Sequence, residues 1–319
     1  SLVAKSIECQ NASAFPLVST HKRGSSGFPQ KRMLQIGSAK ECSKNTGKGS
    51  NVWKLCANLA KIYRKYVNIM MHGKKVVAII PARFASTRFP GKPLVDLGGK
   101  PMIQRTYERV KSVKGFDRIV IATDDQRIFE VAVGFGAEVM MTADTHLTGT
   151  DRCAEVLSRL GETVDYVVNI QGDEPFIEPE QLREVASGFA SGAPVLTLIK
   201  KITDTETLFN TNTPKVICDQ EGHALYFSRQ TIPFLRGVEP SEWLNRHTFY
   251  KHIGLYAYRA DILPGLSALK PTSLELAESL EQLRWIQNGI RIKAIETQFE
   301  TIGIDSPEDL EKIQKMGLI

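Results

Sequence analysis

The sequence predicts an α/β protein with a three-layer α/β/α, Rossmann-like architecture, a mostly parallel sheet and a small inserted subdomain. Two observations lead to this prediction. Largely apolar runs at residues 76–80 and 166–170 have strand length and no alternation, which is typical of parallel strands buried on both faces. Strand-like and helix-like segments also alternate along the chain at the spacing of βαβ units.

The first strand leads into a cationic loop. Pro81, which has no amide hydrogen, marks the end of strand pairing after residues 76–80. The loop then carries three cations and two hydroxyls: Arg83, Ser86, Thr87, Arg88 and Lys92. In open α/β sheets ligands bind outside the carboxyl ends of strands, so this loop suits a polyanion such as a nucleoside triphosphate. It contains neither the G-x-x-x-x-G-K-[ST] phosphate loop nor the G-x-G-x-x-G motif of dinucleotide-binding folds, which indicates a different type of nucleotide site. Plain solvation of these side chains is the alternative.

Helices and strands keep alternating after the loop. A helix is predicted at residues 101–110, where apolar residues recur at helical spacing and Pro101 suits the first turn. The next elements are a strand, a helix, a strand and a helix at residues 117–125, 126–135, 138–142 and 149–157. Thr150 or Asp151 is placed to cap the last of these helices.

A second polar cluster follows the strand that begins at Tyr166. It consists of Gln171, Gly172, Asp173 and Glu174, at the same carboxyl edge as the cationic loop. Gly172 permits a close backbone approach, and Asp173 offers a hard oxygen ligand. Because Mg²⁺ is usually held by one or two carboxylates with phosphate oxygens and water, this cluster predicts a magnesium site. The alternative is that Asp173 and Glu174 only cap a helix at residues 179–189.

The following part of the chain is less regular. Strands are predicted at residues 194–202, 215–219, 224–229 and 250–258. The last of these alternates, so it places His252, Gly254, Tyr256 and Tyr258 on one face. A structural role is the alternative reading for His252. Residues 203–258 interrupt the strand–helix alternation and are predicted to form a smaller subdomain at the edge of the main sheet.

Three elements complete the chain. Residues 271–288 are predicted to form one long amphipathic helix, and residues 290–295 a strand. Ser306 precedes Pro307, which predicts an N-cap with proline at the first position of the final helix. Asp305 lies just outside that helix, where local capping is the alternative to a functional role.

The composition is that of an ordinary globular protein, with 42% hydrophobic and 24% charged residues. No run approaches the about 20 apolar residues that a membrane span requires. The five cysteines have no CxxC spacing, so reduced thiols in a cytoplasmic setting are expected rather than disulfides or zinc.

The positive net charge belongs to residues 1–71. They hold twelve Lys and Arg and two Asp and Glu, which leaves 29 basic and 33 acidic residues in 72–319. The basic pI is therefore no reason to expect nucleic-acid binding by residues 72–319. Residues 1–71, the leader, are interpreted in one of three ways: as a targeting-like segment, as a disordered tail for an acidic partner, or as upstream sequence outside the functional unit. The last is favoured, with a natural start at Met70 or Met71, because the organised pattern begins directly afterwards.

A series of motifs spans residues 74–319: IIPARFASTRFPGKPLVDLGGKPMI, ATDD, TGTDR, NIQGDEP, ALYFSRQTIP, KHIGLYAYR, LEQLRW and GIDSPEDL. In this order they resemble the 3-deoxy-manno-octulosonate cytidylyltransferase, or CMP-KDO synthetase, family. PGKP is shared with other sugar nucleotidyltransferases, whereas QGDEP, YFSR, KHIGLYAYR and LEQLR are specific to this branch. The stretch after Pro233 departs from the pattern, so Arg236 is given no role.

The resemblance implies a reaction. CTP and 3-deoxy-manno-octulosonate (KDO) give CMP-KDO and pyrophosphate with Mg²⁺, for lipopolysaccharide-type sugar activation, in a cytoplasmic homodimer. The sugar's anomeric hydroxyl attacks the α-phosphorus in line, so the protein must mainly position the reactants and offset negative charge.

The resemblance also implies residue roles. Arg83 and Lys92 would hold the triphosphate, with Ser86 as a further phosphate donor. Asp173 and Asp305 resemble the metal ligands. Positions near the base are matched by Ala82, Thr150, Arg152 and Gln171. Positions near the sugar are matched by Arg229, His252, Tyr256, Glu281 and Gln282. Arg229 is the residue expected to bind the sugar carboxylate, and Arg88 is assigned to the phosphates or to that carboxylate.

Two other classes of function compete with this one. The first is a nucleotidyltransferase with another donor or acceptor, such as a sialic acid or a hexose phosphate. The second is a non-catalytic binding module of the same fold, against which the presence of both Asp173 and Asp305 speaks. A nicotinamide oxidoreductase is disfavoured by the missing glycine fingerprint.

Overall fold

The computed structural model describes residues 73–85, 89–304 and 306–319. The leader, Ser86, Thr87, Arg88 and Asp305 lie outside the described residues, so what the sequence predicts for them stays a prediction. The strands are β1 (Val76–Ala82), β2 (Arg118–Thr123), β3 (Glu138–Met141), β4 (Tyr166–Asn169), β5 (Val195–Lys201), β6 (Lys215–Cys218), β7 (Ala224–Ser228), β8 (Tyr250–Arg259) and β9 (Ile292–Glu296). The helices are α3 (Met102–Lys111), α4 (Gln126–Gly134), α5 (Gly149–Arg159), α6 (Pro179–Ser187), α7 (Thr205–Phe209), α8 (Trp243–Arg246), α9 (Leu263–Ala268), α10 (Ser273–Glu278), α11 (Gln282–Gln287) and α12 (Pro307–Lys315).

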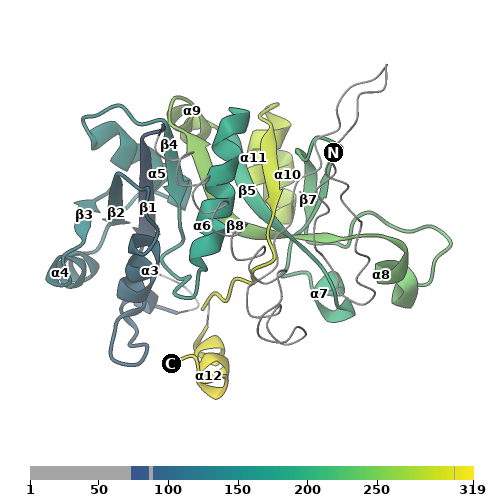
Figure 1. The fold of residues 1–319 in the computed structure, drawn as a ribbon, viewed down its shortest axis with the longest axis horizontal. Coiled ribbons are helices and arrows are strands. Elements are labelled where there is room, and N and C mark those ends of the chain that lie inside the picture. Colours follow the sequence, from purple (N-terminus) through teal and green to yellow (C-terminus); the bar gives the residue numbers. More distant parts are fainter. Residues whose placement is uncertain (1–72, 86–88, 305) are drawn as a thin grey trace, which may run out of the picture. The chain divides into compact units, whose positions relative to one another are not determined.

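The strands form one mixed sheet in the order β3-β2-β1-β4-β8-β5-β9 (Figure 1). The pairs β1–β2, β1–β4, β2–β3 and β5–β9 are parallel, and β8 is antiparallel to both of its neighbours, β4 and β5. The predicted mostly parallel α/β architecture is confirmed. Among the described helices, none is both long enough and apolar enough to cross a bilayer.

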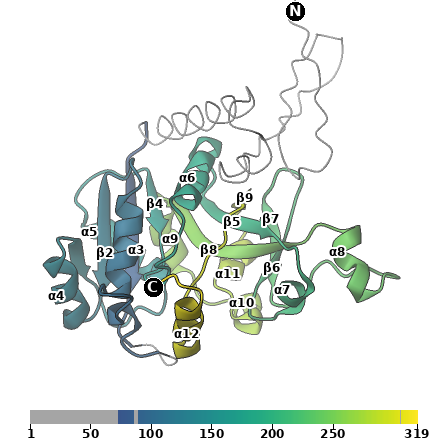
Figure 2. The same ribbon diagram turned by 60° about the horizontal axis from the view of Figure 1, so that its bottom comes forward.

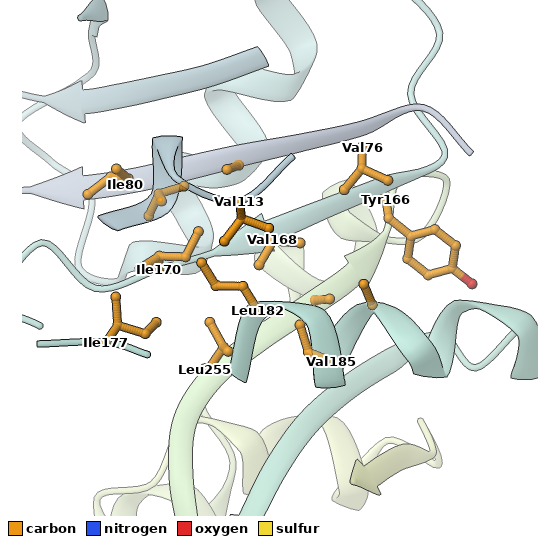
Figure 3. Close-up of a cluster of buried hydrophobic side chains, with 14 of the residues drawn as sticks. Val76, Ile80, Val113, Tyr166, Val168, Ile170, Ile177, Leu182, Val185 and Leu255 are labelled. Carbon is orange, nitrogen blue, oxygen red and sulfur yellow. The ribbon is translucent and has the colours of Figure 1, made fainter. Parts of the chain in front are cut away.

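Both faces of the sheet are covered because β1 is apolar on both sides. Val76, Ala78 and Ile80 belong to a core with residues of α3, α4 and α6. Val77 and Ile79 belong to a second core with residues of α5, α9 and α11. Figure 3 shows Val76 and Ile80 in the first core, with Leu182 and Val185 of α6 among their neighbours. Full burial of one such side chain contributes about 1.5–3 kcal/mol.

The prediction of one helix over residues 271–288 is wrong. The chain forms α10 and α11, separated at Ser279, whose φ of 51° is left-handed and ends α10. The Arg229 side chain stabilises this break by donating hydrogen bonds to the carbonyl oxygens of Glu278 (2.7 Å) and Ser279 (3.3 Å). Glu281 therefore begins a new helix instead of lying in the middle of one.

The helix caps differ in part from those predicted. Thr148, not Thr150 or Asp151, caps α5, and Asp151 completes its capping box. Glu178 caps α6, so Asp173 and Glu174 do not have that role. Ser306 caps α12 with Pro307 in the first turn, as predicted.

Residues 203–258, predicted as a smaller subdomain, contribute both to the main sheet and beyond it. Their last strand, β8, lies in the middle of the main sheet between β4 and β5. The hairpin of β6 and β7 is joined to it through β6. Figure 2 shows α7 and α8 at the end of the sheet opposite α4. A small apolar cluster with Leu208, Trp243 and Phe249 packs there.

Candidate active site

A polar pocket of about 230 Å³ lies at the carboxyl ends of β1 and β4. This is the edge at which the sequence predicts the nucleotide site. The sequence-predicted residues that line it are Ala82, Arg83, Lys92, Arg152, Gln171 and Asp173. Residues that sequence reasoning did not select also line it, among them His146, Leu147 and Thr148. The tertiary structure thus brings the cationic loop and the QGD segment into one cavity.

A close ion pair lies in this pocket. The Nζ atom of Lys92 is 2.5 Å from a carboxylate oxygen of Asp173. The Lys92 side chain is 11% exposed and that of Asp173 is 31% exposed, so the pair is shielded on one side and open to the pocket on the other. Such a pair offers both a fixed cation and an oxygen ligand to a bound polyanion and its metal.

Gly172 allows the ends of β1 and β4 to approach each other. A Cβ atom at this position would lie 2.8 Å from the carbonyl oxygen of Pro81. The amide of Gly172 donates a hydrogen bond to the same oxygen, at 3.2 Å. Glycine is required here because the two backbones are in contact, as predicted from the sequence.

The described part of the cationic loop is closed by local contacts. The amide of Gly91, whose φ is 71°, donates to the carbonyl oxygen of Phe84 at 3.0 Å. The guanidinium of Arg127 lies 3.3 Å from the centroid of the Phe84 ring, and Asp125 holds Arg127 at 2.7 Å. Phe84 is therefore held both by Gly91 within the loop and by Arg127 in the first turn of α4.

Arg152, which lines the pocket, is fixed by groups that sequence reasoning missed. Its guanidinium is 2.6 Å from a carboxylate oxygen of Asp124 and donates to the Thr142 hydroxyl at 2.7 Å. The other Asp124 oxygen, Oδ1, is buried and has no hydrogen-bond partner among the described residues. The ATDD motif was the available signal for Asp124, since this residue directly follows β2 at the same sheet edge.

The short segment before α5 is held by one carboxylate. Glu155 accepts a hydrogen bond from the Ala143 amide at 2.9 Å and contacts His146 Nε2 at 2.6 Å. Leu147, between His146 and the Thr148 cap, is 81% exposed at the pocket. An exposed aliphatic side chain at the rim of a polar pocket provides a surface for a planar base.

The aromatic residues of β8 lie on one face, as the alternation predicts. The ring centroids of His252 and Tyr256 are 5.3 Å apart, and those of Tyr256 and Tyr258 are 6.0 Å apart. His252 Nε2 is 2.9 Å from the Thr197 hydroxyl. Burial lowers the pKa of His252 to about 3, so this imidazole is neutral at physiological pH.

Glu281 faces the first turn of α5. The Thr150 hydroxyl lies 3.2 Å from its Oε2 atom. Burial raises the pKa of Glu281 to about 7, against the opposing effect of hydrogen bonds from Thr150 and Thr148. Nearby, the Tyr256 hydroxyl and the Gln282 amide nitrogen are buried without hydrogen-bond partners among the described residues. Unpaired buried polar groups of this kind are suited to a ligand rich in hydroxyls.

Arg229, predicted to bind a carboxylate, lies at the break between α10 and α11, just before Glu281. Its guanidinium donates to the backbone oxygens of Thr211, Glu278 and Ser279. A bound carboxylate would have to use the remaining N–H donors of the guanidinium or displace one of these carbonyls.

Comparison with known proteins agrees with this geometry. Residues 77–295 match the family model described as cytidylyltransferase. The chain is 54% identical to a 3-deoxy-manno-octulosonate cytidylyltransferase of Cytophaga hutchinsonii over 239 residues, 75% of this chain and 96% of the relative. It is 49% identical to the protein of the same name from Geobacter sulfurreducens, over 75% of this chain and 97% of the relative.

A solved structure shows the same relationship. The structure of a CMP:2-keto-3-deoxy-manno-octonic acid synthetase complexed with CTP aligns with a TM-score of 0.70 and 40% identity. The alignment covers 76% of this chain and 98% of that protein. This chain therefore belongs to the 3-deoxy-manno-octulosonate cytidylyltransferase family.

Proposed function

We propose that this chain is the enzyme that transfers CMP from CTP to KDO, releasing pyrophosphate. The observation that carries the proposal is the Lys92–Asp173 pair, which sets a cation and a carboxylate side by side in a polar pocket. The relatives named above support the choice of CTP and KDO.

The protein's part in this reaction is to position the substrates and offset charge. Arg83, exposed at the pocket, and Lys92 hold the triphosphate, and Lys92 stabilises the leaving pyrophosphate as a point charge. Arg152 and Gln171 lie near the base, with Ser86 as an additional phosphate donor. Alignment of the sugar hydroxyl with the α-phosphorus supplies much of the rate enhancement.

Mg²⁺ is the proposed cofactor, held by Asp173 and Asp305. The partly exposed Asp173 carboxylate in the pocket is a ligand of the type that Mg²⁺ prefers. The amide of Ile304, directly before Asp305, donates to the Asp173 carbonyl at 3.2 Å, so the two segments run side by side at that point. When bound, Mg²⁺ supplies positive charge at the α-phosphate and favours deprotonation of the sugar hydroxyl.

The proposed sugar site consists of Arg229, His252, Tyr256, Glu281 and Gln282, with Arg88 as a further cation. Its support is the unpaired, buried polar atoms of Tyr256 and Gln282. A neutral His252 beside them offers a polar atom without adding charge. This mixture of two guanidiniums, one carboxyl group and neutral donors and acceptors suits a polyhydroxy acid.

The test is pyrophosphate release by the purified chain. We expect release with CTP and KDO that stops on adding a chelator and returns with Mg²⁺, and comparison with Mn²⁺ gives the metal preference. UTP and ATP serve as donor controls, and sialic acid and a hexose 1-phosphate as acceptor controls. Turnover of one of these acceptors in place of KDO would move the chain to another branch, and CTP binding without turnover would favour a non-catalytic module.

We propose in addition that residues 72–319 form the functional unit, working in the cytoplasm as a homodimer in lipopolysaccharide-type sugar activation. The family match within residues 77–295 supports the unit. Phe234 is 74% exposed and Phe209 is 45% exposed, and both rings contact Trp243, which makes this part of residues 203–258 the proposed dimer contact. Sedimentation of the full chain and of residues 72–319, with activity measured for both, tests these points.

A further inference from the structure

The nucleotide pocket and the sugar side are connected by an internal chain of hydrogen bonds. It runs from Gln171 to Asn169 (3.4 Å), from Asn169 to the Tyr258 hydroxyl (3.3 Å), from there to Thr150 (3.1 Å) and from Thr150 to Glu281 (3.2 Å). Gln171 lines the nucleotide pocket, and Glu281 belongs to the proposed sugar site. The three residues between them come from β4, β8 and α5.

The chemistry of the groups determines the direction of every bond in this chain. The amide nitrogen of Asn169 donates to the Tyr258 hydroxyl, so Tyr258 gives its own single hydrogen to Thr150. Thr150, having accepted from Tyr258, donates its hydroxyl hydrogen to the Oε2 atom of Glu281. The remaining polar atom of Asn169 is its carbonyl oxygen, which accepts from the amide nitrogen of Gln171.

The middle of the chain is closed to water. Thr150, Asn169 and Tyr258 are 1%, 2% and 0% exposed. The Tyr258 ring packs edge-on against Trp285 at 5.7 Å, which fixes the position of its hydroxyl. Burial raises the pKa of Tyr258 well above its ordinary value, so the hydroxyl keeps its hydrogen. Buried hydrogen bonds without competing water hold their orientation strongly.

We propose that Tyr258 is a positioning residue that fixes the amide orientation of Gln171 and thereby makes the pocket select cytosine over uracil. Turning the Gln171 nitrogen toward Asn169 turns its oxygen away from Asn169. That oxygen accepts from the exocyclic amino group of cytosine, whereas uracil presents an acceptor oxygen at the same place. A glutamine free to rotate would serve either base, and the chain removes that freedom.

This inference rests on the proposed function in one respect, since it places Gln171 beside the base. The experiment compares kcat/KM for CTP and UTP, with KDO, and also Kd for both nucleotides without KDO. Tyr258→Phe removes the tyrosine hydroxyl from the hydrogen-bond chain. Thr150→Val removes the threonine hydroxyl, whereas Thr150→Ser keeps a hydroxyl at that position. Tyr166→Phe is the matched control, because that hydroxyl is also buried and hydrogen-bonded (3.2 Å, to the Phe189 carbonyl) but lies outside the chain.

We expect Tyr258→Phe and Thr150→Val to lower the CTP-to-UTP ratio by about tenfold, mainly through a higher KM and Kd for CTP. Thr150→Ser and Tyr166→Phe should keep the ratio of the unmodified protein. The inference is overturned if the ratio is unchanged in a folded Tyr258→Phe or Thr150→Val protein, or if Tyr166→Phe lowers it equally. It is also overturned if the unmodified protein binds both nucleotides alike. Selective CTP binding without KDO turnover would refute the proposed function and leave this inference standing.

Discussion

Lys92 and Asp173 meet at 2.5 Å although they lie 81 residues apart in the chain. One follows β1 and the other follows β4, and these strands are parallel neighbours, so their carboxyl ends open on the same pocket. The pair is a direct consequence of the sheet order. It also defines which substitutions should affect the chemistry most.

Asp173→Asn should abolish most of the activity. The amide is nearly the same size but carries no charge, so it binds Mg²⁺ poorly and removes the carboxylate that pairs with Lys92 at 2.5 Å. We expect pyrophosphate release to fall about a hundredfold or more. Asp261→Asn, at a 62% exposed side chain paired with Arg259, is the control and should keep full activity. An unchanged rate in Asp173→Asn would falsify the metal assignment.

Asp124→Ala should weaken both the fold and CTP binding. It leaves the Arg152 guanidinium, with a side chain only 4% exposed, without its carboxylate. Loss of one partner of a buried pair costs about 3–5 kcal/mol, so urea unfolding should show a decrease of that order, and the KM for CTP should rise. Asp261→Ala removes an exposed pair instead and should cost less than about 1 kcal/mol. Equal losses in the two variants would show that Asp124 has no special role.

Gly172→Ala should separate the ends of β1 and β4. The new methyl group would lie 2.8 Å from the Pro81 carbonyl oxygen, which is backbone and cannot rotate away. We expect a loss of about 1–3 kcal/mol in the free energy of unfolding and about a tenfold decrease in kcat/KM. Gly134→Ala, where a Cβ atom would meet nothing within 4 Å, is the matched substitution and should change neither quantity much. Normal kinetics in Gly172→Ala would mean that the pocket tolerates a wider spacing between the ends of β1 and β4.

Glu281 should make stability depend on pH. Burial is the largest effect and raises its pKa from 4.5 to about 7, while hydrogen bonds from Thr150 and Thr148 act in the opposite direction. The folded protein therefore keeps this proton to a higher pH than the unfolded chain. The resulting stabilisation is complete below about pH 4.5 and is lost as the pH rises to about 7.

Urea unfolding of Glu281→Gln across this pH range is the measurement. As the pH rises across this range, the free energy of unfolding should decrease in the unmodified protein and should decrease less in the Glu281→Gln variant. Burial also raises the pKa of Glu184 to about 7. Glu184→Gln should therefore also make the free energy of unfolding decrease less with rising pH, independently of Glu281. Glu311→Gln, at a side chain that is 70% exposed, should leave the pH dependence as it is. Identical pH curves for Glu281→Gln and the unmodified protein would contradict the expected titration.

Several elements could be predicted from the sequence because their cause is local. Residues 76–80 are apolar at every position, and a segment of that kind forms a strand covered on both faces. Ser306 before Pro307 places a cap and a rigid first turn in adjacent positions, and α12 begins there. The cationic loop and the QGD segment each follow a buried, largely apolar strand, so their shared edge was also predictable.

Other features were misjudged because their cause lies elsewhere in the chain. The apolar spacing of residues 271–288 is helical throughout, yet Ser279 is left-handed and Arg229, from another part of the chain, stabilises the break. The sequence around α5 offers several capping residues, and nothing local chooses Thr148 over Thr150. Thr150 instead contacts Tyr258 and Glu281, which are distant in sequence.

By itself the sequence determined the α/β class, the strand that supports the cationic loop, and the family to which the motifs belong. It could do so because burial pattern, turn chemistry and motif order are properties of neighbouring residues. Only the tertiary structure decided that β8 enters the sheet antiparallel between β4 and β5. That position brings Tyr258 next to Thr150, 108 residues away in the chain. Packing of α5 against the sheet likewise brings Arg152 to Asp124, 28 residues away. Such pairs depend on how strands are ordered in space, and strand order is a property of the whole packed sheet.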